Sequence, residues 1–148
     1  ELFRVSRRQI IWGGNYFSLP PTRCFLVWEK TNIPEKFTMA MAEYAWTNLN
    51  DNAKIFRFSS QGIPGRFHPT QKPVALLEYL VKTYTLPGQT VLDCFMGSGS
   101  TGEACLNTGR RFVGIERNVD YYDVAENRLR TVEKPHTADH TAQMQLEL

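Results

Sequence analysis

A glycine-rich segment between two acidic residues is the part of the chain best suited to chemistry. Residues 97–102 read Gly-Ser-Gly-Ser-Thr-Gly and match the pattern G-x-G-x-x-G. The segment follows a predicted strand at 90–95 and opens a predicted helix at 101–108, which is the context in which this pattern binds nucleotides. Its glycines permit a tight turn and a close approach of a ligand to the backbone, and the helix N-terminus offers N–H groups to an anion.

Glu116 closes the next predicted strand, which runs over 111–116. A carboxylate at that point can accept hydrogen bonds from both hydroxyls of a ribose. The order strand, turn, helix, strand and acid therefore predicts a cofactor that contains a nucleoside. A purely structural glycine turn with an incidental surface glutamate is the alternative, and this order disfavours it.

Asp93 indicates which cofactor this is, because it precedes the glycines at the carboxyl end of the first strand. In a nicotinamide dinucleotide the nearby pyrophosphate is anionic, so Asp93 would repel it. S-adenosylmethionine carries a cationic amine on its methionyl end, which suits a carboxylate. The charges thus favour S-adenosylmethionine, and an Asp93 that points into the fold is the remaining alternative.

The elements that must position these residues alternate in type. A helix is predicted to begin at Pro73, where apolar residues recur at helical spacing, and Pro87-Gly88 ends it. Another helix is predicted after Asn118, which can cap it. With the two strands and the short helix, the second half reads helix, strand, helix, strand, helix. This alternation predicts an α/β fold with parallel strands.

The first half is predicted to consist of strands with little helix. An apolar run at 24–28 predicts a strand buried on both faces, and residues 9–17 predict a strand that ends in a Gly-Gly loop. Residues 43–47 and 54–58 are predicted to pair as a hairpin, because the turn-forming segment 50–52 lies between them. These strands would extend the mostly parallel sheet and add an antiparallel hairpin at its edge.

The composition is that of one ordinary globular domain, with 148 residues of which 42% are hydrophobic and 22% charged. It excludes wholesale disorder, a collagen and a coiled coil. No apolar run approaches the roughly 18 residues of a membrane helix, and no secretory signal opens the chain. The 3 cysteines and 3 histidines lack metal-ligand spacing, so reduced thiols and no metal site are expected.

The net charge of +2 is too small to predict a nucleic-acid partner by itself. The basic residues nevertheless gather in two places, and an ordinary solvated surface is the alternative explanation. The early cluster contains Arg4, Arg7, Arg8 and Arg23, and the middle cluster contains Arg66, His68 and Lys72.

Three segments in a fixed order resemble motifs of DNA amino-methyltransferases. Residues 93–101, DCFMGSGST, resemble the cofactor motif D-x-F-x-G-S-G-T-T, and residues 68–73, HPTQKP, look like the motif that these enzymes place just upstream. Residues 112–129 are similar to the family's ending F-x-G-I-E…Y…A…R-L. The segments IIWGGNYF, CFLVWEK and AEYAWT resemble a phage and prophage adenine-specific subgroup, which extends the likeness to about 4–132.

The resemblance implies a permuted, beta-class-like member of that family with a Rossmann-like, S-adenosylmethionine-dependent methyltransferase fold. Such an enzyme transfers a methyl group from S-adenosylmethionine to the N6 amino group of adenine in double-stranded DNA, after the base is flipped out of the duplex. A cytosine N4 enzyme is the close alternative. A C5-cytosine enzyme is disfavoured, because no Pro-Cys pair supplies its nucleophile. The implied setting is restriction–modification in the cytoplasm of a bacterial or phage-infected cell.

The resemblance also assigns cofactor contacts residue by residue. Asp93 would lie by the methionyl amine, and Glu116 would hold the ribose hydroxyls. The segment 68–73 would close over the cofactor, although Thr70 and Pro73 also make an ordinary helix start. The expected cofactor-binding residues are Asp93, Phe95, Gly97, Ser98, Gly99, Thr101, Glu116, His68, Thr70 and Lys72.

Target-side contacts are expected in the first half of the chain and in the loop before residue 68. Aromatic residues in buried strands are usually core, which is the alternative role for Tyr16 and Trp28. Arg66 would contact phosphates and so position the duplex without reading it. The expected DNA-binding residues are Arg66, Asn15, Tyr16 and Lys30, with Trp28 as a further candidate.

The chain lacks the family's catalytic motif [DNS]-P-P-[YFW], whose side chain and first backbone carbonyl accept hydrogen bonds from the target amino group. Residues 19–22, Leu-Pro-Pro-Thr, hold the only Pro-Pro pair, and they lack the polar and aromatic positions. We therefore expect the motif and two sheet strands to precede Glu1, so that this incomplete chain is inactive alone. The expected layout is a methyltransferase domain over 1–132, with target-side strands at 1–58, a recognition loop at 59–67 and a cofactor-binding part at 68–132, followed by a flexible tail at 133–148.

Two other functions fit part of the sequence. A dinucleotide-dependent oxidoreductase would explain the glycine pattern and Glu116, but it gives the HPTQKP segment no role. A non-catalytic remnant that still binds cofactor or DNA would explain the absent motif.

Overall fold

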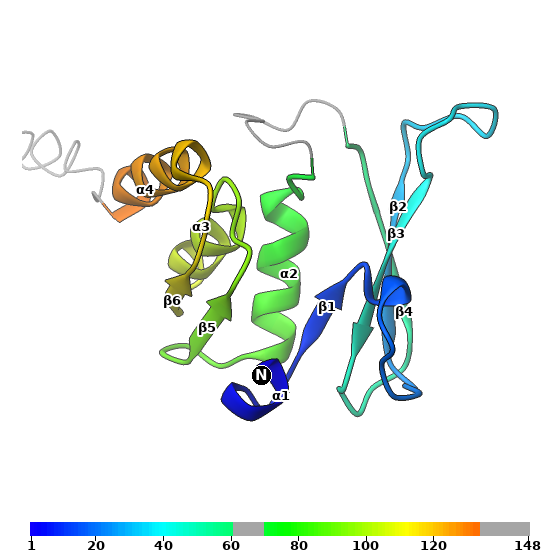
Figure 1. The fold of residues 1–148 in the computed structure, drawn as a ribbon, viewed down its shortest axis with the longest axis horizontal. Coiled ribbons are helices and arrows are strands. Elements are labelled where there is room, and N and C mark those ends of the chain that lie inside the picture. Colours follow the sequence, from blue (N-terminus) through cyan, green and yellow to red (C-terminus); the bar gives the residue numbers. More distant parts are fainter. Residues whose placement is uncertain (61–69, 134–148) are drawn as a thin grey trace, which may run out of the picture. The chain divides into compact units, whose positions relative to one another are not determined.

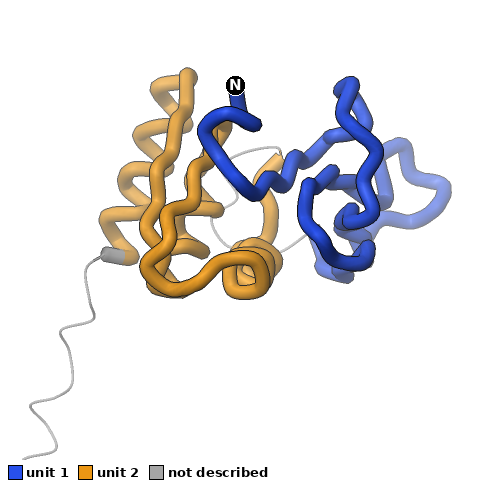
Figure 2. The backbone as a smooth tube through the Cα atoms, turned by 90° about the horizontal axis from the view of Figure 1, so that it is seen from below, with its two compact units in different colours: residues 1–64 blue, residues 65–148 orange. Residues whose placement is uncertain are grey.

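Two compact units make up the chain, Glu1–Pro64 and Gly65–Leu148, shown in blue and orange in Figure 2. The computed structural model describes residues 1–60 and 70–133, and each unit is described by itself. The expected recognition loop therefore falls almost wholly outside the described residues, as does the expected tail beyond its first residue. The single methyltransferase domain over 1–132 stays a prediction.

The first unit is built on a sheet of four strands in the order β1-β3-β2-β4 (Figure 1). Strand β3 runs antiparallel to both of its neighbours, and β4 runs parallel to β2. All four strands were expected from the apolar runs, whereas the short helix α1 was not. The elements are α1 (Leu2–Val5), β1 (Ile10–Trp12), the 3-10 turn η1 (Gly14–Tyr16), β2 (Phe25–Lys30), β3 (Ala42–Thr47) and β4 (Lys54–Phe58).

The hairpin expected between 43–47 and 54–58 is wrong. Val27 of β2 pairs with Tyr44 of β3 on one side and with Ile55 of β4 on the other, so β2 separates the two strands. The antiparallel hairpin is instead formed by β2 and β3. The inner position between β3 and β4 encloses β2, whose Leu26 and Trp28 are buried. The chain bends at Asn50 and Asp51, but β4 then pairs with β2 and not with β3.

Strand β2 is buried on one face, not on both as its composition suggested. Leu26 and Trp28 are at most 1% exposed, whereas Phe25 is 37% exposed and Val27 is half-buried. Successive side chains of a strand point to opposite faces, so an apolar run can still be one-sided. The Trp28 indole N–H donates to the Phe58 carbonyl at 3.0 Å, which ties β2 to the end of β4.

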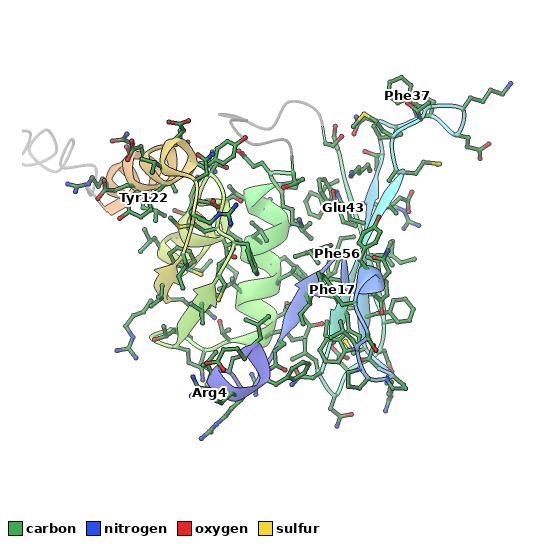
Figure 3. The ribbon with its side chains drawn as sticks, viewed as in Figure 1. Arg4, Phe17, Phe37, Glu43, Phe56 and Tyr122 are labelled. Carbon is green, nitrogen blue, oxygen red and sulfur yellow. The ribbon has the colours of Figure 1, made fainter. Side chains whose placement is uncertain are left out.

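The loop between β2 and β3 projects away from the sheet, with Phe37 labelled near its tip in Figure 3. Phe37 is 55% exposed. The base of the loop is held by Asn32, whose side-chain oxygen accepts the N–H of Ser60 at 2.6 Å. The loop is therefore anchored at its base and solvent-exposed at its end.

The second unit has the predicted alternation of helices and parallel strands. Strands β5 (Thr90–Asp93) and β6 (Arg111–Gly114) pair in parallel, with Asp93 opposite Gly114. Helix α3 (Ser100–Asn107) packs on both strands, and it also packs against α2 (Val74–Tyr84) and α4 (Val119–Glu133) (Figure 1). The mixed α/β class is thus confirmed. The core of this unit contains Leu76, Leu77, Leu80, Ala104, Cys105 and Ala125.

Among the residues that the structure describes, no helix is both long and apolar enough to cross a membrane.

Candidate cofactor-binding site

Asp93 and Glu116 lie at the same edge of the β5–β6 pair. Asp93 is the last residue of β5, and Glu116 follows the end of β6. The strand contacts continue past these ends, because the Ile115 N–H donates to the Asp93 carbonyl at 2.9 Å and the Met96 N–H donates to the Ile115 carbonyl at 3.1 Å. Ligands of open α/β sheets bind outside the carboxyl ends of the strands, so these two acids lie where a cofactor is expected.

The glycine-rich segment forms a tight turn between β5 and α3. Gly97 and Gly99 have φ angles of +52° and +78°, which are left-handed values that favour glycine. Gly99 lies against α4, because a Cβ at this position would be 2.9 Å from the Cβ of Ala125. The Gly99 N–H donates to the Met96 carbonyl at 2.9 Å and closes the turn. The turn predicted from G-x-G-x-x-G is therefore confirmed as backbone geometry.

Glu116 holds the turn directly. One carboxylate oxygen accepts the Gly97 N–H at 2.9 Å, and the other accepts the Asn118 N–H at 2.9 Å. The side-chain oxygen of Asn118 accepts the Tyr121 N–H at 3.1 Å, which confirms the predicted cap of α4. A carboxylate offers about four lone-pair positions, so Glu116 can accept further hydrogen bonds from a ligand while it keeps both backbone contacts.

Asp93 and Phe95 form the other side of the turn. One carboxylate oxygen of Asp93 accepts the Phe95 N–H at 3.0 Å, which fixes the side chain at the sheet edge. Phe95 is 84% exposed, so its ring is available to cover a ligand. Asp93 is half-buried, and the arrangement suits a cation next to its carboxylate.

Cys105, in the last turn of α3, is fully buried. Burial raises the pKa of its thiol to about 12, and the negative charge of Asp93 adds to the rise, while Arg110 opposes it. The thiolate is the reactive form, and at pH 8 only about one thiol in 10,000 would be ionised.

We therefore expect Cys105 to resist iodoacetamide in the native protein from pH 7 to 9. Its alkylation should rise only as the pH approaches about 12, because the pKa is raised and the thiol stays protonated below it. Peptide mass spectrometry measures the modification, with urea-unfolded protein as the positive control. Rapid labelling of Cys105 at pH 8 in folded protein would contradict the burial.

The segment before α2 reaches the turn through a residue that was not among the expected contacts. Gln71 is 5% exposed, and its side-chain oxygen accepts the hydroxyl of Ser98 at 2.7 Å. Thr70 is exposed and Lys72 is half-buried. In the sequence, the only sign of a role for Gln71 is its position within HPTQKP. Its burial could not be predicted, because it depends on how α2 packs against α3. His68 and Arg66 lie outside the described residues.

Thr101 is half-buried in the first turn of α3. The structure brings most of the expected cofactor residues that it describes together at one sheet edge, in or beside the glycine-rich turn. These are Asp93, Phe95, Gly97, Ser98, Gly99 and Glu116. The Ser98 hydroxyl points to Gln71 within this turn.

The expected DNA-side residues that the structure describes belong to the first unit. Asn15 and Tyr16 lie in η1, and Tyr16 is 84% exposed. Lys30 forms an ion pair with Glu43 at 3.0 Å and lies 5.2 Å from the centre of the Trp28 ring. Trp28 itself is buried, which agrees with a position in the core, the alternative role given for it above.

A cavity of about 370 Å³ opens between β6 and α4, and Tyr122, labelled in Figure 3, lines it together with Met96, Phe112 and Leu129 among others. None of the expected cofactor-binding residues that the structure describes lines this cavity. Neither Asp93 nor Glu116 lines it. Over the described ranges 1–60 and 70–133, no group of three or more His, Cys, Asp and Glu residues could hold a metal ion.

The carboxyl edge of two parallel strands, a left-handed glycine turn and an acid after the second strand are together typical of α/β proteins that bind a nucleoside cofactor. Comparison with known proteins identifies the family within this class. The chain belongs to the DNA methylase family of N6 and N4 methyltransferases, because residues 12–127 match the sequence model of that family.

Relatives and solved structures agree with this assignment. The chain is 46% identical over 69 residues to the protein YubD of Escherichia coli (strain K12), covering 47% of this chain and 30% of YubD. It is 46% identical over 72 residues to the type II methyltransferase M.HinfI of Haemophilus influenzae, covering 49% of this chain and 20% of M.HinfI. The chain thus spans less than a third of the curated relatives that it matches.

The fold is that of DNA methyltransferases. The crystal structure of the M1.HpyAVI–SAM complex superposes with a TM-score of 0.61 and 35% sequence identity, covering 71% of this chain and 60% of that chain. The cytosine-N4-specific PvuII DNA methyltransferase superposes with a TM-score of 0.59 at 15% identity, covering 74% of this chain and 54% of that chain. At that identity the second match supports the fold alone.

Proposed function

We propose that this chain is the cofactor-binding and target-side part of a DNA methyltransferase, which transfers a methyl group from S-adenosylmethionine to the N6 amino group of adenine. The observation that carries the proposal is the turn held between Asp93 and Glu116 in a chain of the DNA methylase family. In the reaction S-adenosylmethionine supplies the methyl group, and the residues of this chain bind and orient it.

S-adenosylmethionine fits the chemistry of the residues at this edge. Asp93 offers a fixed carboxylate for the methionyl amine, and Glu116 offers lone pairs for the ribose hydroxyls. The exposed Phe95 ring can cover an apolar surface of the ligand. The carboxylate of Asp93 beside the turn would repel a dinucleotide pyrophosphate, which disfavours the oxidoreductase alternative.

The choice of adenine N6 over cytosine N4 rests on the likeness of IIWGGNYF, CFLVWEK and AEYAWT to the phage and prophage adenine-specific subgroup. These segments cover β1, β2 and β3, on the target side of the permuted motif order that we propose. The distinction can be made by mass spectrometry of hydrolysed DNA from cells that express the enzyme. Detection of N4-methylcytosine without N6-methyladenine would reverse the assignment.

We propose further that these 148 residues need a segment with the [DNS]-P-P-[YFW] motif for methyl transfer, because the chain contains no such motif. The partner is double-stranded DNA in the cytoplasm, in a restriction–modification setting of a bacterial or phage-infected cell. Arg66, Asn15, Tyr16 and Lys30 are its proposed contacts. Tritium transfer from labelled donor to DNA by the 148 residues alone would overturn the need for the motif.

Isothermal titration calorimetry tests the cofactor assignment. We expect the protein to bind S-adenosylmethionine and its demethylated product S-adenosylhomocysteine, and not to bind NAD. Binding of NAD alone would favour the oxidoreductase, and binding of neither ligand by the folded protein would refute the proposal.

Glu116→Gln is expected to weaken S-adenosylmethionine binding by about 10-fold or more. Glutamine has one oxygen, so one of the two backbone N–H donors loses its acceptor, and the ribose loses charged acceptors as well. Calorimetry measures the affinity. Glu103→Gln is the matched control, because it breaks an ion pair with Arg128 (3.5 Å) that lies outside the turn. Equal affinities in the two variants would contradict the role of Glu116.

A further inference from the structure

The hydroxyl of Ser98 and the side chain of Gln71 form a hydrogen bond that is shielded from water. The distance between the two oxygens is 2.7 Å, and the residues are 2% and 5% exposed. The bond joins positions 27 residues apart, one before α2 and one in the glycine-rich turn. A buried hydrogen bond of this kind is costly to leave half made, because the remaining partner is desolvated without compensation.

The turn has few other side chains with which it can be fixed. Ser98 lies between Gly97 and Gly99, which both have positive φ angles. Glycine has more conformational freedom than any other residue, so ordering these two positions carries a large entropic cost. The hydroxyl of Ser98 is the side-chain anchor at the centre of the turn, and the structure connects it to Gln71.

Gln71 lies two residues before Pro73, in the segment that leads into α2. Pro73 precedes α2, is buried, and accepts the N–H of Leu77 through its carbonyl at 3.2 Å. Leu76 and Leu77 are buried in the first turns of α2. The start of α2, next to Gln71, is therefore a buried part of the unit, and α2 packs against α3.

We propose that Gln71 is a positioning residue, which holds the glycine-rich turn in the shape that accepts the cofactor. The turn is then fixed at two points: Glu116 holds the N–H of Gly97, and Gln71 holds the hydroxyl of Ser98. Gln71 acts through Ser98 rather than on the ligand, since the two side chains are buried and bonded to each other. This inference rests on the proposed function for the identity of the ligand, S-adenosylmethionine.

A double-mutant cycle tests the proposal. Gln71→Met keeps the length of the side chain and removes the acceptor, and Ser98→Ala removes the donor. We expect each single variant to raise the Kd for S-adenosylmethionine by about 5- to 10-fold, and the double variant to bind no more weakly than either single variant. Ser98→Ala keeps the proposal testable if Gln71→Met fails to fold.

Thr85→Val is the matched control for lost stability. Thr85 ends α2 far along the helix from Gln71, where its hydroxyl donates to the Val81 carbonyl and accepts from Arg110. We expect Thr85→Val to lower the thermal stability of the unliganded protein and to leave the Kd unchanged. Equal Kd values for wild type, Gln71→Met and Ser98→Ala would overturn the proposal, as would independent, additive losses in the double variant.

Hydrogen exchange gives a readout that does not depend on the ligand. In unliganded protein, Gln71→Met should speed exchange of the Gly97 and Gly99 amides, which donate to Glu116 and Met96. If wild type binds no S-adenosylmethionine while these amides still exchange faster in the variant, the proposed function fails and the positioning role stands. Unchanged exchange in a protein that binds S-adenosylmethionine would refute the positioning role alone.

Discussion

Asp93→Asn is expected to weaken the binding of S-adenosylmethionine by about 10- to 100-fold. A hydrogen bond to a charged group contributes about 1.5–3 kcal/mol, which corresponds to this range. Asparagine keeps the size of the side chain and an oxygen that can accept the Phe95 N–H, the contact that is 3.0 Å long in the structure. The loss should therefore report the charge of Asp93 rather than the shape of the turn. Isothermal titration calorimetry measures the affinity.

A ligand without the amine provides the matched control. The compound 5′-methylthioadenosine keeps the adenosine part and lacks the methionyl amine, so its affinity should be the same in wild type and in Asp93→Asn. A loss that is equal for both ligands would mean that the variant disturbs the turn. Unchanged binding of S-adenosylmethionine would show that Asp93 does not face the amine, and a gain of NAD binding would favour the oxidoreductase.

The second unit could be predicted because its signals are local. The left-handed angles of Gly97 and Gly99 follow from glycine-rich turn chemistry, and Asn118 caps α4 through its own side chain. The placement of Asp93 and Glu116 at one edge follows from parallel pairing, which the alternation of helices and strands implies. Each of these features depends on a few neighbouring residues.

The pairing of the first four strands could not be predicted in the same way. The segment 50–52 is a good turn sequence, yet β4 pairs with β2 instead of β3. The pairing of β4 with β2 depends on how β2 is buried in the complete sheet, and a short stretch of sequence carries no information about that burial. Gln71 was missed for a similar reason, because its contact with Ser98 joins segments that only the packing of α2 and α3 brings together.

Gly99→Ala is expected to lower the free energy of unfolding of the second unit by about 2–4 kcal/mol. Two costs add at this position. Alanine at a φ of +78° is strained, and its Cβ would lie 2.9 Å from the Cβ and 3.1 Å from the Cα of Ala125. The Cα of Ala125 is backbone of α4, so relief of the contact requires the helix or the turn to move. Either movement would also displace the Gly97 N–H from Glu116 and weaken cofactor binding.

Gly109→Ala separates the two costs. Gly109 also has a positive φ, of +72°, but a Cβ there would meet nothing within 4 Å, so only the strain of about 1 kcal/mol applies. Urea unfolding of the second unit is followed by circular dichroism, because this unit contains the helices α2, α3 and α4. Tryptophan fluorescence would not report it directly, since all 3 tryptophans lie in the first unit. Equal losses of unfolding free energy in both variants would mean that α4 moves to accommodate the added methyl group. A larger loss in Gly99→Ala, together with a raised Kd for S-adenosylmethionine, would mean that the packing of α4 against the turn sets the shape of the cofactor site.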